Sequence, residues 1–267
     1  KAELVEGMKT GGVAVLNADD VRVAAMEPLS KGRTITYGIA NKADVMAENI
    51  EFARFGETVF DLSFRDNKAE VKFPLNGKHN ILNALAAASV GISFGMTVTD
   101  IAESLKTVEP PPQRGEVLHF ANGFTVINDS YNSNPTALLS MVATFVEGGS
   151  GAKRKIVVAG EMLELGGEEK GIHRQTGEQI AASGIDMLIG VRGLAKELVD
   201  GARSGGLENA EFAVDSDAAG ALLLQIVAAG DVILVKGSRG VRTEKVIEKL
   251  LEKFELEAEE KSDTVIQ

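Results

Sequence analysis

A cluster of polar side chains follows a predicted strand near the middle of the chain, at the kind of position where open parallel sheets bind ligands. The strand covers 124–128, and the segment at its end reads Asn128-Asp129-Ser130-Tyr131-Asn132-Ser133-Asn134-Pro135. A turn into a helix explains two of these residues, because Asn134 suits the cap and Pro135 the first helical position. It does not explain the carboxylate, the phenol and the amide of Asp129, Tyr131 and Asn132. We therefore interpret these three as candidate ligand-binding residues.

A second cluster places two carboxylates beside glycines, after a predicted strand at 155–159. Glu161 and Glu164 belong to the segment Gly160-Glu161-Met162-Leu163-Glu164-Leu165-Gly166. Two carboxylates at a strand end could hold a metal ion or an amine. A solvated loop could contain the same residues, so residue chemistry leaves both interpretations open.

A third cluster connects the predicted strand 231–235 to the last predicted helix, and it reads Lys236-Gly237-Ser238-Arg239-Gly240. The backbone N–H groups at the start of that helix, together with Lys236 and Arg239, would form an anion site near Ser238. A carboxylate or a phosphate is the ligand that this chemistry favours. The alternative is a tight turn between two solvated cations.

Polar residues also open a long apolar helix earlier in the chain, in the run Gly77-Lys78-His79-Asn80. Asn80 and Asn83 are three residues apart, and a buried amide needs hydrogen-bond partners, which the edge of a polar ligand could supply. A lone histidine such as His79 is more often structural than a ligand. Arg114 follows three prolines at an expected domain junction, where small-molecule sites are common.

The elements that must position these clusters form two domains, separated by Pro110-Pro111-Pro112, because three prolines fit neither a helix nor a central strand. After the prolines, strands alternate with helices. Strands are expected at 124–128, 155–159, 186–190, 211–214 and 231–235, and helices at about 136–147, 168–183, 193–203, 217–229 and 241–254. This alternation predicts a Rossmann-like, doubly wound domain with a parallel sheet covered on both faces.

The part before the prolines predicts a different α/β domain. Strands at 12–17 and 34–39 flank a short helix at 21–26, and an antiparallel meander with polar turns follows at about 49–75. The helix at 79–94 is apolar on nearly every face, which predicts burial on all sides. A helix at 100–108 would be capped by Thr99. We expect domains at 1–109 and 110–256, and a flexible acidic and polar tail at 257–267.

Composition narrows the classes of function. The chain has 267 residues, no cysteine and a formal net charge of -11, which excludes disulfides and thiolate zinc sites and argues against a nucleic-acid-binding surface. No apolar run is long enough to cross a membrane, and no signal peptide is evident at the start. These features fit a cytoplasmic protein.

Taken together, the clusters resemble the Mur ligases, a bacterial family that builds the peptide stem of peptidoglycan. The resemblance is carried by six segments: 17–20 (Asn-Ala-Asp-Asp), 77–84 (Gly-Lys-His-Asn-Ile-Leu-Asn-Ala), 113–115 (Gln-Arg-Gly), 128–135, 160–166 and 234–239. It covers the chain from Lys1 to about Leu251, and it is closest to the branch that joins D-alanyl-D-alanine to UDP-N-acetylmuramoyl-tripeptide.

The resemblance implies an enzyme of three domains: a uridine-nucleotide-binding domain, a central ATPase domain and a Rossmann-like C-terminal domain. ATP phosphorylates the terminal carboxylate of the tripeptide substrate, and the amine of D-alanyl-D-alanine attacks the acyl phosphate. Mg²⁺ offsets negative charge during this transfer.

The resemblance also implies roles for individual residues. The nucleotide contacts would come from Asn80 (adenine), Asn83, Arg114, Asp129 (ribose) and Tyr131. The substrate contacts would come from Asn132, Asn134, Glu161, Glu164, Lys236, Ser238 and Arg239. Lys1 and His79 would be catalytic, and Lys1 matches a lysine that some members carbamylate to hold a second magnesium ion. Asn80, Arg114 and Asp129 would converge on one nucleotide shared by the two domains.

The chain departs from the family pattern at one place. The glycine-rich loop ending in Gly-Lys-Thr or Gly-Lys-Ser, which binds the ATP phosphates, does not occur at the expected position, and neither do the acidic magnesium ligands upstream. We therefore expect the chain to correspond to the later part of the central domain plus the C-terminal domain, and to be inactive alone. The alternatives are another ligase of the superfamily, such as a folylpolyglutamate synthetase, or a non-catalytic binding module. A nicotinamide oxidoreductase is disfavoured, because no strand leads into Gly-x-Gly-x-x-Gly.

Overall fold

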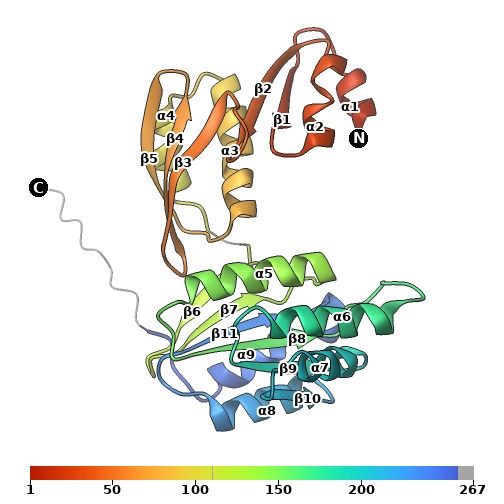
Figure 1. Ribbon diagram of the computed structural model, residues 1–267. Coiled ribbons are helices and arrows are strands. Elements are labelled where there is room, and N and C mark those ends of the chain that lie inside the picture. The colour runs from red at the N-terminus through yellow and green to blue at the C-terminus, as the bar shows by residue number, and fades with distance from the viewer. Residues whose placement is uncertain (110, 258–267) are drawn as a thin grey trace, which may run out of the picture. The chain divides into compact units, whose positions relative to one another are not determined.

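The computed structural model describes residues 1–109 and 111–257, without the side chains of residues 53 and 54. The chain divides into two compact units, Lys1–Pro110 and Pro111–Gln267 (Figure 1). Pro110 of the predicted linker and most of the predicted tail, 258–267, lie outside the described residues.

The first unit is built on a five-stranded sheet in the order β1-β2-β3-β4-β5. Its strands are β1 Val13–Asn17, β2 Arg33–Gly38, β3 Val45–Arg54, β4 Glu57–Phe64 and β5 Asn67–Phe73. The first three strands run parallel, and the last three form the antiparallel meander that the polar turns predict. Alternate residues of β4, including Phe60 and Leu62, are buried in the core of this unit.

The helices of the first unit are α1 Ala2–Glu6, α2 Val21–Ala24, the 3-10 helix η1 Glu27–Leu29, α3 Lys78–Ser93 and α4 Val98–Leu105. The expectation that α3 is buried on all sides is wrong. Its buried residues are Ile81, Ala84, Leu85, Ala88 and Ser89, which repeat every three to four positions, whereas Val90 is exposed. Small alanines cover much of the helix, so an apolar composition did not require full burial. The cap of α4 is Thr97, not Thr99, because the Thr97 side chain accepts a hydrogen bond from the Asp100 amide.

The second unit contains a six-stranded sheet in the order β10-β9-β8-β11-β7-β6. Its strands are β6 Glu116–His119, β7 Thr125–Asp129, β8 Arg154–Gly160, β9 Met187–Val191, β10 Ala210–Ala213 and β11 Asp231–Lys236. The five strands from β7 to β11 are parallel, as predicted. The last strand in sequence, β11, lies between β7 and β8. This order brings the ends of the three chemically richest strands together.

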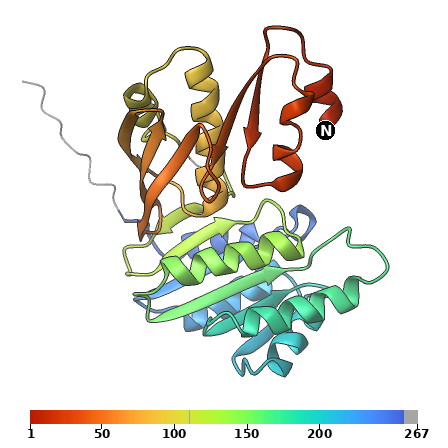
Figure 2. The same cartoon turned by 45° about the horizontal axis from the view of Figure 1, so that its top comes forward.

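The helices of the second unit are α5 Pro135–Gly148, α6 Glu169–Ala181, α7 Ala195–Ser204, α8 Ser216–Ile226, the 3-10 helix η2 Arg239–Val241 and α9 Glu244–Leu251. Figure 2 shows α5 and α6 side by side along one face of the sheet. One core cluster joins α8 and α9 to the sheet, with Leu223 and Leu250 packed against residues such as Val158 and Ile233. The expected α/β class with a doubly wound second domain is confirmed.

Two features at the edge of this sheet differ from the sequence-based expectation. The edge strand β6 pairs antiparallel with β7, so the sheet is mixed. The flexible tail was predicted to begin at residue 257, yet the Glu257 amide donates to the His119 carbonyl, and the Ala121 amide donates to the Glu255 carbonyl just before it. Phe254 packs edge-on against the buried Phe124, and this contact anchors the segment after α9 to the core. Within the described residues, no helix has the length and apolar character needed to cross a membrane.

Candidate functional site

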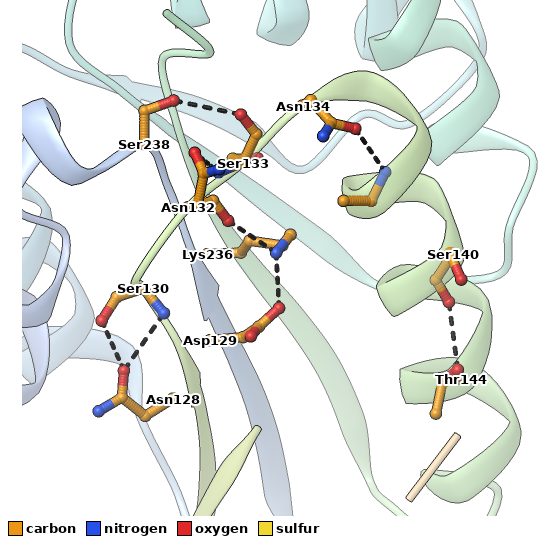
Figure 3. Close-up of polar contacts among 11 residues, drawn as sticks. Asn128, Asp129, Ser130, Asn132, Ser133, Asn134, Ser140, Thr144, Lys236 and Ser238 are labelled. Atoms are coloured by element: carbon orange, nitrogen blue, oxygen red, sulfur yellow. Dashed lines mark hydrogen bonds and ion pairs between the residues drawn. The ribbon is translucent and has the colours of Figure 1, made fainter. Parts of the chain in front are cut away.

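The best-developed polar site lies at the carboxyl ends of β7, β11 and β8 in the second unit. Asp129 and Lys236 are register neighbours on β7 and β11, and Lys236 is also paired with Ala159 on β8. The Lys236 Nζ atom lies 2.6 Å from Asp129 Oδ2 and donates to the Asn132 carbonyl at 2.9 Å (Figure 3). The Lys236 side chain is only 5% exposed. A charge buried this deeply needs its partner, so the pair fixes the start of the loop after β7.

Ser238 joins the three strand-end loops to one another. Its hydroxyl accepts a hydrogen bond from the Leu163 amide at 3.1 Å, in the loop after β8. The same hydroxyl donates to the Ser133 carbonyl at 3.3 Å, in the loop after β7 (Figure 3). Ser238 and Ser133 are both buried, and the Ser133 hydroxyl has no hydrogen-bond partner among the described residues. The site therefore contains a buried hydroxyl that a ligand could satisfy.

Two glycines let these strands end close to the last helix. A Cβ atom on Gly160 would lie 2.8 Å from the Thr243 methyl carbon, and one on Gly237 would lie 2.7 Å from the same atom. Any side chain there would push the segment before α9 away from the strand ends. Thr243 has no signal in the sequence, because its role arises from close packing and not from a motif.

Both Asn132 and Asn134 of the loop after β7 accept a hydrogen bond from a nearby backbone amide. Asn134 caps α5, because its Oδ1 atom accepts from the Ala137 amide at 2.8 Å, as the Asn-Pro pair predicts. Asn132 Oδ1 accepts from the Ser133 amide at 2.8 Å. Both side chains belong to exposed residues beside the buried Ser133. The substrate contacts expected of these two asparagines stay predictions.

Arg114 and Tyr131 form a flat surface next to this loop. The Arg114 guanidinium lies 4.1 Å from the centre of the Tyr131 ring, and Tyr131 is 45% exposed. The preceding Gln113 accepts from the Tyr131 amide through its carbonyl and from Arg239 Nη1 through its side chain, at 3.1 and 2.6 Å. An exposed ring stacked on a cation suits a planar base or an anionic group.

The two glutamates after β8 have different surroundings. Glu161 Oε1 accepts from the Leu194 amide at 2.8 Å, just before α7, and its carboxylate fills the space beside Gly193 where a Cβ would stand. A carboxylate at the start of a helix stabilises it, which gives Glu161 a structural role. Glu164 is exposed and has a φ of 63°, in the left-handed region. The substrate contacts expected of both residues stay predictions.

His173 was not identified from the sequence, yet it is fully buried behind the loop after β8. Its Nε2 atom accepts from the Met162 amide at 3.0 Å, and its Nδ1 atom lies 2.7 Å from the Glu169 carbonyl. No motif or composition signal distinguishes this histidine, since its partners are backbone atoms.

The predicted site residues of the first unit are less enclosed than expected. Asn83 is exposed, so the argument that it is a buried amide in need of a ligand is wrong. Asn80 is partly buried and donates to the Asn76 carbonyl at 2.9 Å. His79 lies exposed in the first turn of α3, and Lys1 lies exposed before α1. Asn80 belongs to the first unit, whereas Arg114 and Asp129 belong to the second, so the convergence of the three residues stays a prediction.

A tightly held carboxylate connects β1 and β2 in the first unit. Asp19 accepts from the Ile39 and Asn41 amides at 2.7 Å each, and from the Ala40 amide at 3.1 Å. Burial raises the pKa of Asp19, but these backbone hydrogen bonds outweigh it, so the pKa lies below its ordinary value of 3.8. Asp19 therefore ties the ends of these two strands together.

Known proteins that resemble the chain point to one family. Two models of that family match it: the Mur ligase middle domain over residues 1–91 and the Mur ligase, glutamate ligase domain over residues 113–239. The UDP-N-acetylmuramoyl-tripeptide–D-alanyl-D-alanine ligase of Mycobacterium bovis is 33% identical, across 89% of the chain and 50% of the relative. The ligase of the same name from Escherichia coli is 32% identical, across 94% of the chain and 55% of the relative.

A solved structure gives the same result. A crystal structure of MurF from Acinetobacter baumannii superposes with a TM-score of 0.83 at 25% identity, and covers 95% of the chain and 55% of that protein. The chain thus spans about half the length of the curated relatives that it matches.

Proposed function

Because the chain belongs to the Mur ligase family, we propose that it is the acceptor-binding part of an ATP-dependent carbon–nitrogen ligase. The proposed reaction adds D-alanyl-D-alanine to UDP-N-acetylmuramoyl-tripeptide, the reaction that the relatives' names describe. We propose the bacterial cytoplasm as the compartment of this reaction, because the reaction consumes ATP and a uridine-linked substrate.

The observation that carries the proposal is the junction at Ser238. This residue connects the loops after β7, β8 and β11 through hydrogen bonds to the Ser133 carbonyl and from the Leu163 amide. The Ser133 hydroxyl, which has no hydrogen-bond partner within 1–109 and 111–257, lies beside this bond. A dipeptide offers an ammonium donor and carbonyl and carboxylate acceptors, and either kind of group would satisfy a hydroxyl.

The charges around the junction suit an anionic acceptor. Lys236 uses two of its three N–H donors on Asp129 and the Asn132 carbonyl, which leaves one for a ligand. Arg239 is held by Gln113, and its side chain is 63% exposed. We assign these two cations to the carboxylate of the dipeptide, because a fixed cation needs little reorganisation when the anion arrives.

The nucleotide contacts are assigned to Arg114, Tyr131 and Asp129. The exposed ring of Tyr131 offers a stacking surface, and Arg114 offers charge for a phosphate. Asp129 offers carboxylate oxygens for ribose hydroxyls, while Lys236 holds the carboxylate in place. ATP supplies the phosphoryl group that activates the tripeptide carboxylate, and these residues would orient the nucleotide.

The described residues do not form a complete binding site for Mg²⁺. Over 1–109 and 111–257, no three side chains of histidine, cysteine, aspartate or glutamate gather in a group that could hold a metal ion. The roles proposed for these residues therefore include no step on the metal. The assignment of Lys1 as a carbamylated ligand is kept as a proposal that rests on the family pattern alone.

Calorimetric titration with a panel of acceptors tests the proposal. The chain should bind D-alanyl-D-alanine more tightly than L-alanyl-L-alanine, D-glutamate or diaminopimelate. Ser238→Ala should weaken binding about tenfold, the effect of roughly one lost hydrogen bond. Ser140→Ala, on the exposed side of α5, is the matched control and should change nothing. Equal binding of the D- and L-dipeptides would contradict the proposed function.

A further inference from the structure

His173 holds one tautomer, and the geometry fixes which one. It lies in α6, four residues after Glu169, and no part of it is exposed to solvent. A backbone amide can only donate, so the Met162 N–H bond requires Nε2 to be an unprotonated acceptor. The remaining nitrogen, Nδ1, then carries the proton and donates to the Glu169 carbonyl. The ring is therefore neutral and bridges α6 to the loop after β8.

The loop that His173 holds is the one that reaches Ser238. Three consecutive residues of this loop are fixed by different elements. Glu161 bonds through its amide to the Val191 carbonyl at 3.0 Å, Met162 bonds to His173, and Leu163 bonds to Ser238. The amides of Met162 and Leu163 belong to adjacent peptide units. Turning the first unit would turn the second away from the Ser238 hydroxyl.

We propose that His173 is a positioning residue, whose Nε2 atom orients the Met162–Leu163 segment so that Ser238 and Ser133 are held for the acceptor. The proposal rests on the proposed function, because it takes Ser238 and Ser133 as part of the acceptor site. His173 is fully buried, so it offers no surface for direct contact with a ligand. It acts through the Met162 amide, whose orientation sets that of the Leu163 amide, and the Leu163 amide donates to Ser238 at the ends of β7, β8 and β11.

Two substitutions of similar size separate positioning from simple core packing. In His173→Gln, the side-chain amide reaches the place of Nε2 and can still accept from the Met162 amide. In His173→Asn, the shorter side chain reaches only the place of Nδ1 and can still donate to the Glu169 carbonyl. Both variants lose the ring from the core. A packing role predicts equal effects, whereas positioning through Nε2 predicts that Gln rescues and Asn does not.

Nuclear magnetic resonance on the ¹⁵N-labelled chain reads the tautomer and the loop directly. The chain has three histidines, so the His173 ring signals are identified by their loss in His173→Gln. The Nδ1–H tautomer is expected at pH 7. Amide hydrogen exchange at Met162 and Leu163 should speed up about tenfold or more in His173→Asn, and should stay within about threefold of wild type in His173→Gln. His119→Gln, at the exposed end of β6, is the control for the loss of an imidazole.

The dipeptide titration supplies the functional readout. His173→Asn should bind D-alanyl-D-alanine about tenfold more weakly than wild type, and His173→Gln about as well as wild type. An Nε2–H tautomer, or equal exchange rates in the two variants, would overturn the inference. So would full dipeptide affinity in His173→Asn. A failure of the proposed function gives a different result, because the wild-type chain would then not bind the dipeptide. The tautomer and the exchange rates would still decide whether His173 orients the loop.

Discussion

Asp129 and Lys236 are 107 residues apart in sequence, yet their charged atoms lie 2.6 Å apart at neighbouring strand ends. The contact exists because β11 inserts between β7 and β8. The Lys236 side chain is 5% exposed and that of Asp129 is 19% exposed. The pair therefore serves two purposes, since it closes the loop after β7 and fixes a cation at the proposed acceptor site.

Removing one charge of this pair should destabilise the second unit more than removing both charges. Lys236→Met leaves the partly buried Asp129 charge without its partner, and should lower the free energy of unfolding of the second unit by about 3 kcal/mol. The double variant Asp129→Asn with Lys236→Met should recover about half of that loss. Tyr131 is the only tyrosine of this unit and the chain has no tryptophan, so tyrosine fluorescence in a Tyr37→Phe background follows it during urea unfolding. Additive effects of the two substitutions would contradict the coupling.

Asp19 should make the first unit sensitive to acid. Its folded pKa lies below its ordinary value, because three backbone amides stabilise the carboxylate against the opposing effect of burial. A lowered folded pKa means that the stabilisation is present above the unfolded pKa of 3.8 and is lost as the pH falls through the folded value. Asp19→Asn should thus lower the free energy of unfolding of the first unit by about 2 kcal/mol at pH 7, and by much less near pH 2.

Urea unfolding in a Tyr131→Phe background, where Tyr37 reports on the first unit, measures this difference. Asp66→Asn is the matched control, because Asp66 is exposed in the turn between β4 and β5. An Asp19→Asn penalty that is the same at both pH values would show that the charge of Asp19 is not the cause.

Glu161 should behave as a structural residue at the start of α7. Glu161→Ala removes the acceptor for the Leu194 amide and a negative charge from the N-terminal end of the helix, and should destabilise the second unit by about 1 kcal/mol. Glu161→Gln keeps an acceptor oxygen and should cost less. Glu164→Ala, at an exposed position in the same loop, should have no effect beyond about 0.5 kcal/mol. Thermal unfolding of the three variants tests this order.

Nucleotide binding should depend on Asp129 and Arg114. In a longer protein that joins this segment to a phosphate-binding loop, Asp129→Ala should raise the apparent KM for ATP. Arg114→Ala should do the same through loss of the stacked cation, whereas Arg174→Ala on α6 should not. The 267-residue chain alone should release no phosphate from ATP when D-alanyl-D-alanine is added. Steady-state phosphate release measures all of these, and an unchanged KM in Asp129→Ala would remove Asp129 from the nucleotide site.

The sequence predicts the parallel strands of the second unit well, because each is a short apolar run that ends in polar or glycine residues. It places Asp129 and Lys236 at strand ends for the same reason. It does not predict their contact, since that requires knowing that β11 lies between β7 and β8. The order of strands is set by packing across the whole sheet and not by any local pattern.

The errors have similar physical causes. The apolar composition of α3 predicted burial on all sides. Its small alanines can lie at the surface, however, so only one face of the helix is buried, and Asn83 lies on the exposed face. Thr97 and Thr99 are both suitable caps by type, and only backbone geometry selects Thr97. His173 has no sequence signal, because it bonds to the backbone of residues 11 and 4 positions earlier.

Amide chemical-shift mapping of the ¹⁵N-labelled chain during titration with D-alanyl-D-alanine tests most directly whether the Ser238 junction receives the acceptor. The expected result is a set of saturable shifts at 131–134, 162–163 and 237–239, absent with L-alanyl-L-alanine and weakened by Ser238→Ala. Shifts confined to other parts of the second unit, or identical responses to the two dipeptides, would contradict the assignment of this edge of the sheet as the acceptor site.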